Sequence, residues 1–189
     1  GVKKDGTLMA LTNECYLEGG AYTSFGIATV YYAGSLLGAP YRLPNMKYDG
    51  YRIYTNRPAC GAQRGHGGVA SRAAWEQQID FIAEELGMDP VEIRMKNSME
   101  AGDITCNDFN TSSFGMKECI QAVKEGSKWD EKKGKMPEGK GIGIATGFFV
   151  SGAGYPIYRS ETAHSTVVIK LNEDGGTAHV LTGSAEIGQ

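Results

Sequence analysis

Closely spaced cysteine pairs are absent from this 189-residue sequence, and their absence argues against the common cysteine-based metal sites. The four cysteines, Cys15, Cys60, Cys106 and Cys119, include no C-x-x-C pair, so zinc or iron–sulfur ligation is not expected. The N-terminus also lacks the apolar segment of a signal peptide. We therefore expect reduced thiols and a cytoplasmic protein.

Long apolar runs and an excess of positive charge are lacking as well. No apolar run reaches the roughly 18 residues that a membrane helix requires, so we expect no membrane span. The formal net charge of −3 argues against nucleic-acid binding, which normally needs a broad basic face. With 41% hydrophobic and 22% charged residues, the composition is that of an ordinary soluble globular protein.

Glycine, in contrast, is abundant, and four glycines fall in one short loop. The chain has 27 glycines, and residues 61–68 read GAQRGHGG. Free loop amides ahead of a helix can bind phosphate or other oxyanions, and glycine lets the backbone approach a ligand closely. The loop is not a P-loop, because no Gly-Lys-Ser/Thr follows, and it is not a dinucleotide fingerprint, because G-x-G-x-x-G is missing and no parallel βαβ unit is predicted around it. A tight turn whose arginine has only a structural role is an equal alternative.

The apolar pattern predicts an α+β chain of mixed strands and helices. Alternating residues in 51–56 predict a strand that runs into the glycine loop. Residues 25–37 are apolar throughout and fit either a helix or a buried strand. Residues 141–149 read as a further strand, and 165–183 read as a hairpin whose turn contains Asp174-Gly175-Gly176.

Three helices are predicted after the glycine loop. The first covers 69–86, where four apolar residues have helical spacing: Trp75, Ile79, Ile82 and Leu86. Asp89 as N-cap and Pro90 at the first helical position predict a second, short helix. Ser112 or Ser113 is expected to cap a third helix, with a buried face formed by Met116, Cys119, Ile120 and Val123.

Histidines do not form a recognisable metal site in this sequence. The three histidines, His66, His164 and His179, include no i, i+4 pair. We interpret His66 as a hydrogen-bonding residue behind the glycine loop rather than as a metal ligand.

A second glycine turn, GSAEIGQ, occupies residues 183–189, where Glu186 and Gln189 supply hydrogen-bonding groups. Both ends of the sequence resemble cuts through a larger fold. We therefore expect residues 1–189 to be a partial domain, incomplete at both ends, with a possible subdivision in the charged stretch 129–141.

Taken together, these motifs resemble the molybdenum-cofactor subunit of the xanthine dehydrogenase and aldehyde oxidase family, the molybdenum hydroxylases. The segment TNRPACGAQRGHGG at 55–68 matches the family pattern TN…P…GAxRGxG. The segment ELGMDPVEIRMKN at 85–97 matches LGxDPxExRxxN, and EIGQ at 186–189 resembles the E-M-G-Q-G turn. The resemblance covers essentially the whole chain, in family order.

The resemblance implies a molybdopterin-type molybdenum cofactor, with the cytosine dinucleotide form as one option. Its neighbours would be Gly61, Ala62, Gln63, Arg64 and Gly65, together with Gly188 and Gln189. Arg64 would lie beside the metal and act through its backbone. The activity would be hydroxylation with water as the oxygen source, or reductive dehydroxylation, of a small aromatic, N-heterocyclic or aldehyde substrate.

The resemblance also implies that the chain carries only part of a site. Gln63 stands where many relatives have an aromatic residue. The family's catalytic glutamate belongs to a motif downstream of this sequence, so no catalytic residue is predicted here and the chain alone is expected to be inactive. Expected partners are the remainder of the molybdenum subunit, a subunit with iron–sulfur clusters and a subunit with FAD.

Two alternatives from other classes remain at this stage. The chain could be a structural or assembly module of such a complex that never contacts the metal. It could also be an unrelated phosphate-binding domain that uses residues 61–68 for a mononucleotide, in which case Arg64→Ala would weaken nucleotide binding.

Overall fold

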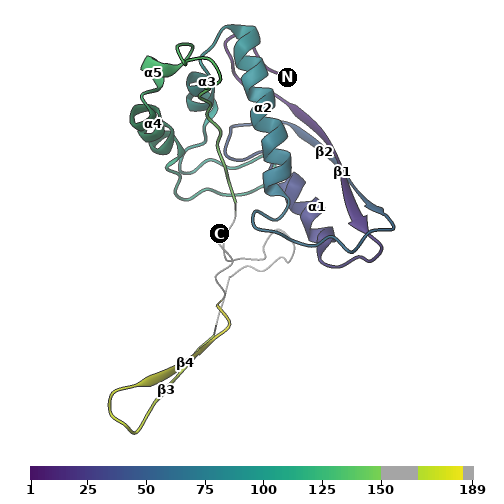
Figure 1. The fold of residues 1–189 in the computed structure, drawn as a ribbon, viewed down its shortest axis with the longest axis vertical. Helices are drawn as coiled ribbons and strands as arrows, with labels where there is room; N and C mark the ends of the chain where they lie inside the picture. Colours follow the sequence, from purple (N-terminus) through teal and green to yellow (C-terminus); the bar gives the residue numbers. More distant parts are fainter. Residues whose placement is uncertain (150–165, 185–189) are drawn as a thin grey trace. The chain divides into compact units, whose positions relative to one another are not determined.

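The computed structural model describes residues 1–149 and 166–184 (Figure 1). The chain divides into two compact units, residues 1–148 and residues 149–189. In chain order the elements are β1 (Leu11–Gly20), α1 (Gly26–Ser35), β2 (Met46–Tyr54), α2 (Gly68–Leu86), α3 (Pro90–Asn97), α4 (Met116–Ser127), α5 (Trp129–Lys132), β3 (Val167–Leu171) and β4 (Ala178–Thr182).

The first three elements form a parallel β–α–β unit. β1 pairs in parallel with β2, from Leu11 opposite Met46 to Gly20 opposite Tyr54, and α1 packs against both strands. The prediction that no parallel βαβ unit surrounds the glycine loop is therefore wrong. The ambiguous segment 25–37 contains the connecting helix, whose buried residues are mostly glycine and alanine and so leave no recognisable apolar period.

The two helices predicted directly after the glycine loop are confirmed. In α2 the side chains of Trp75 and Ile79 are 4% and 1% exposed, as the helical spacing requires. At the start of α3 the Asp89 carboxylate accepts a hydrogen bond of 2.7 Å from the Val91 N–H, and Pro90 occupies the first turn. Local capping signals therefore located both helices correctly.

The third helix is present as α4, but its predicted cap and buried face are wrong. α4 follows Gly115, so neither Ser112 nor Ser113 caps it. Ile120 is the one predicted core residue that is buried, whereas two others are exposed, Cys119 and Val123. The reason is that α4 packs chiefly against α3 and α5, so most of its surface faces away from the core.

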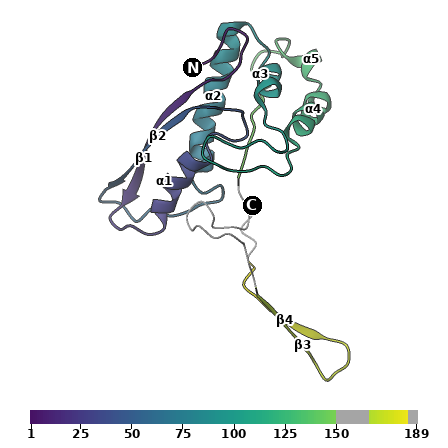
Figure 2. The same cartoon turned by 180° about the vertical axis from the view of Figure 1, so that it is seen from behind.

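Two apolar clusters hold the first unit together. The larger cluster joins the segments around α1 to α2 and α3 through Leu8, Leu37, Tyr41, Leu43, Trp75, Ile79, Ala83 and Ile93. The smaller cluster joins α3 to α4 and α5 through Val91, Ile120 and Trp129. Figure 2, like Figure 1, places α2 between the β1–β2 pair on one side and α3, α4 and α5 on the other.

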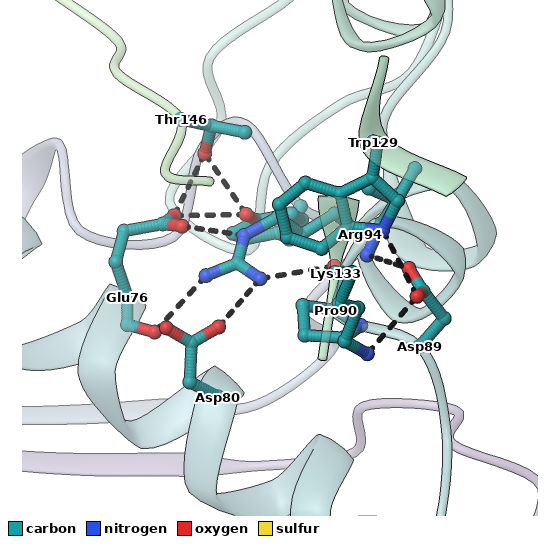
Figure 3. Close-up of polar contacts among 10 residues, drawn as sticks. Glu76, Asp80, Asp89, Pro90, Arg94, Trp129, Lys133 and Thr146 are labelled. Atoms are coloured by element: carbon teal, nitrogen blue, oxygen red, sulfur yellow. Dashed lines mark hydrogen bonds and ion pairs between the residues drawn. The ribbon is translucent and has the colours of Figure 1, made fainter. Parts of the chain in front are cut away.

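A buried polar network links α2 to α3 (Figure 3). Arg94 is fully buried, and its guanidinium contacts the carboxylates of Glu76 and Asp80 at 2.8 Å each. The same Glu76 carboxylate accepts hydrogen bonds from the hydroxyls of Tyr41, at 2.8 Å, and Thr146, at 2.7 Å. Burial and the adjacent Glu76 charge raise the pKa of Tyr41, so its hydroxyl remains a donor.

The predicted strand at 141–149 is wrong, whereas the predicted hairpin is confirmed. Among the described residues no strand pairs with 141–149; Ile142 and Ile144 instead pack onto the smaller apolar cluster, which explains their alternation. In the second unit, β3 and β4 pair antiparallel, and the Asp174 carboxylate accepts from the N–H groups of Gly176 and Thr177.

The mixture of helices and strands confirms the α+β class. Within residues 1–149 and 166–184, no helix combines the length and the apolarity that a membrane crossing requires.

Removal of the buried guanidinium in the intact protein is expected to destabilise the α2–α3 pair. Arg94→Met leaves the Glu76 carboxylate buried without its cation, so the free energy of opening should fall by about 3–5 kcal/mol. Native-state hydrogen exchange of the α2 and α3 amides measures this change. Glu84→Gln, on the exposed side of α2, is the control and should change it by less than about 0.5 kcal/mol; equal effects would contradict the prediction.

Asp89 should make a pH-dependent contribution to the stability of α3. Burial acts to raise the pKa of Asp89, but hydrogen bonds from Trp129, Lys133 and the Val91 N–H outweigh it, so the pKa lies below the ordinary 3.8. Asp89→Ala should therefore cost about 1–2 kcal/mol near neutral pH.

The sign of this pH dependence follows from the lowered pKa. The Asp89 contribution is complete above pH 3.8 and is lost as the pH falls through the lower pKa of the folded state. Hydrogen exchange of α3, corrected for the intrinsic rate at each pH, checks this from about pH 7 to about pH 2. If the difference in the free energy of opening between wild type and Asp89→Ala stayed constant over that pH range, the predicted pH dependence would be disproved.

Candidate functional site

The glycine loop lies between the end of β2 and the start of α2. Gly61, Ala62, Gln63 and Arg64 are exposed, and Gly65 is half-buried. These residues therefore form one continuous accessible stretch. Gly188 and Gln189, the other predicted neighbours of a cofactor, lie outside the described residues.

The backbone amides of this stretch are free to bind a ligand. Within the described residues, no acceptor pairs with the N–H groups of 61–65. Two carbonyls of the loop accept hydrogen bonds from elsewhere in the described chain: the N–H of His66 donates to Gln63 at 2.7 Å and the N–H of Gly68 donates to Gly65 at 2.8 Å. Consecutive exposed N–H groups are a binding surface for anionic or oxygen-rich ligands.

Main-chain hydrogen bonds hold the N-terminal side of the loop against the end of β1. The Cys60 N–H donates to the Gly19 carbonyl at 3.2 Å, and the Thr55 N–H donates to the Gly20 carbonyl at 3.1 Å. The Ala21 N–H in turn donates to the Arg57 carbonyl at 2.9 Å. The segment that leads into the loop is thus tied to β1 over its whole length.

Close packing holds the C-terminal side of the loop against α1. The His66 ring stacks on Phe25, with centroids 5.4 Å apart, and lies 4.9 Å from the ring of Tyr32. Its Nε2 is buried without an acceptor or donor among the described residues, and burial lowers the pKa of His66. The expectation that His66 supports the loop by hydrogen bonding was incomplete, because its contacts with α1 are chiefly aromatic.

Gly67 allows α2 to start in contact with α1. Its φ is +86°, and a Cβ at this position would lie 2.1 Å from the carbonyl oxygen of Thr29. Any larger residue would therefore have to displace the backbone of α1 or of the loop.

Three arginines on or beside the loop in sequence lack a carboxylate partner among the described residues: Arg52, Arg64 and Arg72. Arg42, Arg57 and Arg94 each form ion pairs with acidic side chains. Arg52 and Arg72 instead donate to backbone carbonyls, and burial lowers the pKa of Arg72. The charges of Arg52 and Arg64 thus have no acidic partner among the described residues, which favours an anionic ligand near the loop.

Sequence reasoning identified Arg64 but overlooked Arg52 and Arg72. The sequence did offer one signal for Arg52: it lies on the other face of β2 from Tyr51. An arginine on a strand face that is covered by another element needs hydrogen-bond acceptors or an acidic partner. The described residues also contain no cluster of histidine, cysteine or acidic side chains that could bind a metal ion. The ligand chemistry of the loop is thus that of main-chain donors and unpaired cations.

Substitution of Gly67 should disturb the loop much more than substitution of Gly61. Gly67→Ala forces an alanine to a φ of +86° and into contact with Thr29, so the free energy of opening at the α2 N-terminus should fall by more than about 1 kcal/mol. Gly61→Ala meets only the Ser24 hydroxyl, at 3.6 Å, and should be tolerated. Hydrogen exchange of residues 66–72 in the intact protein compares the two variants, and similar rates would contradict the assignment.

Comparisons with known proteins identify the family to which the chain is related. The family profile described as the molybdopterin cofactor-binding domain matches residues 1–98. The chain is 32% identical over 191 residues to the aldehyde oxidoreductase of Megalodesulfovibrio gigas, with 99% of this chain and 20% of that protein covered. It is 31% identical over 195 residues to the putative xanthine dehydrogenase molybdenum-binding subunit XdhA of Escherichia coli (strain K12), with 100% of this chain and 25% of that protein covered.

A solved structure resembles the chain in the same way. The aldehyde oxidoreductase from Desulfovibrio gigas superposes with a TM-score of 0.64 and 31% identity, over 70% of this chain and 15% of that one. The chain spans about a fifth to a quarter of the length of the curated relatives it matches. It belongs to the molybdopterin cofactor-binding family of the molybdenum hydroxylases, which includes the xanthine dehydrogenases and aldehyde oxidoreductases.

Proposed function

We propose that the 61–65 loop supplies main-chain hydrogen-bond donors to a molybdopterin-type cofactor in an oxidoreductase of this family. The observation that carries the proposal is the run of N–H groups without acceptors, on a loop that is held at both ends. Anionic or oxygen-rich parts of a pterin cofactor fit such donors, and the unpaired arginines add favourable charge.

In this proposal each part of the loop has a separate role. Gly61, Ala62, Gln63 and Gly65 bind the cofactor, and Arg64 lies beside the metal and acts through its main chain. Gly188 and Gln189, which lie outside the described residues, bind the pterin or its phosphate. The cofactor, when bound, supplies the redox chemistry, and these residues orient it and hold its oxygens.

The substrate in this proposal is a small aldehyde, aromatic or N-heterocyclic compound, hydroxylated with water as the oxygen source. The names of the relatives support this class, because they include an aldehyde oxidoreductase and a xanthine dehydrogenase subunit. A cytosine dinucleotide form of the cofactor, iron–sulfur clusters and FAD on other subunits or domains, and a cytoplasmic location complete the proposal. The catalytic carboxylate comes from polypeptide outside residues 1–189, which in this proposal form part of the cofactor-binding domain.

Two substitutions of Arg64 in the intact enzyme separate its main chain from its side chain. Arg64→Pro removes the N–H, and Arg64→Ala keeps the N–H but removes the guanidinium. If the main chain binds the cofactor, Arg64→Pro should lower the content of pterin and molybdenum about tenfold or more, with a much smaller loss in Arg64→Ala. Pterin fluorescence after oxidation and elemental analysis measure the two contents.

The opposite results have clear meanings. A larger loss in Arg64→Ala than in Arg64→Pro would show that the guanidinium, and not the N–H, binds the cofactor. A wild-type enzyme that contains neither pterin nor molybdenum would overturn the proposal and favour an assembly module.

A further inference from the structure

Arg52, in β2, contacts three separate segments that meet beneath the glycine loop. Its Nη2 donates to the carbonyls of Gly19 at 2.9 Å, Thr23 at 2.7 Å and Cys60 at 3.0 Å. These carbonyls belong to the end of β1, to the turn before α1 and to the residue directly before the loop. One side chain thus fixes the N-terminal end of the loop to both neighbouring elements.

The surroundings of Arg52 are shaped to admit its guanidinium. A Cβ at Gly19 would lie 2.8 Å from Nε, and a Cβ at Gly26 would lie 1.3 Å from Nη1. Glycine at these two positions therefore leaves the space that the guanidinium occupies. Three elements contribute to this arrangement: β2 supplies the arginine, and β1 and α1 each supply a glycine that leaves room for it.

The charge of Arg52 is held in place without a counter-ion. Its Nε and Nη1 are buried and have no acceptor among the described residues, and no carboxylate in that part of the chain forms an ion pair with it. Arg52 is half-buried, and with only carbonyls as partners among the described residues it gains no ion pair to offset the desolvation of its buried atoms. The cost is offset where an anionic group binds close by.

We propose that Arg52 is a positioning residue that holds Cys60 so that the N–H groups of 61–65 face the cofactor. This inference rests on the proposed function of the loop. Arg52 acts through the main chain of Cys60, whose N–H also donates to Gly19. Its fixed charge adds positive potential on the side of the loop where the free amides begin.

Arg57 provides a matched control on the same segment. Its side chain is 76% exposed and pairs with the Glu18 carboxylate at 3.3 Å, which is a largely exposed ion pair of small value. It lies between the same strand and the same loop, and no hydrogen bond joins its side chain to Cys60 in the described structure.

The test compares Arg52→Met, Gly26→Ala and Arg57→Met in the intact protein, with and without cofactor. In the cofactor-free protein, hydrogen exchange at the Cys60 amide should rise about tenfold or more in Arg52→Met, while α3 is unchanged. Gly26→Ala keeps the charge and favours helix, but it displaces the guanidinium and should therefore show the same local rise. Arg57→Met should leave this exchange within about twofold of wild type.

In the loaded protein, pterin retention during gel filtration provides the second measurement. Both variants that disturb Arg52 should lose pterin about tenfold faster than wild type, because disordered amides must be reordered on binding. Arg52→Lys should recover only part of the retention, since one ammonium does not reproduce the planar guanidinium.

Three results would overturn the inference. These are unchanged exchange at Cys60 in Arg52→Met and Gly26→Ala, an equal rise throughout α2 and α3 that marks general unfolding, and a loosened loop with unchanged pterin retention. Absence of pterin from the wild-type protein would instead contradict the proposed function, and this result requires a pterin measurement on the wild-type protein only. The two failures are therefore distinguishable.

Discussion

The buried ion pair between Arg94 and Glu76 is the interaction on which the arrangement of the first unit depends. A fully buried guanidinium tolerates little displacement of its carboxylate, so α3 fixes the position of α2. Tyr41 and Thr146 extend the same network to the segments before β2 and after α5. Because α2 directly follows the glycine loop, this network holds the helix from which the loop's C-terminal end extends.

The loop itself combines two firmly held ends with an open centre. Hydrogen bonds to β1 and the Arg52 contacts hold one end, and packing of His66 and Gly67 against α1 holds the other. A short stretch held in this way loses little conformational entropy when it binds a ligand. Exposed residues with few contacts of their own can therefore present their N–H groups in a fixed arrangement.

Local signals predicted the elements that depend on neighbouring residues. The apolar spacing in α2, the Asp89-Pro90 start of α3 and the turn of the β3–β4 hairpin were all confirmed. Predictions failed where distant packing decides. The parallel pairing of β1 with β2 was not predicted, and the alternating residues of 141–149 lie on the core without a partner strand among the described residues.

The family, the position of the glycine loop and its content of main-chain donors and arginine could be predicted from the residues in order along the chain. Which donors have no acceptor and which cations have no acidic partner among the described residues became evident from the folded arrangement, because hydrogen bonds and ion pairs are completed by residues far away in the chain, as Cys60 is by Gly19 and Arg52. A residue such as Arg52 therefore looks ordinary in the sequence and becomes significant only where three segments meet around it.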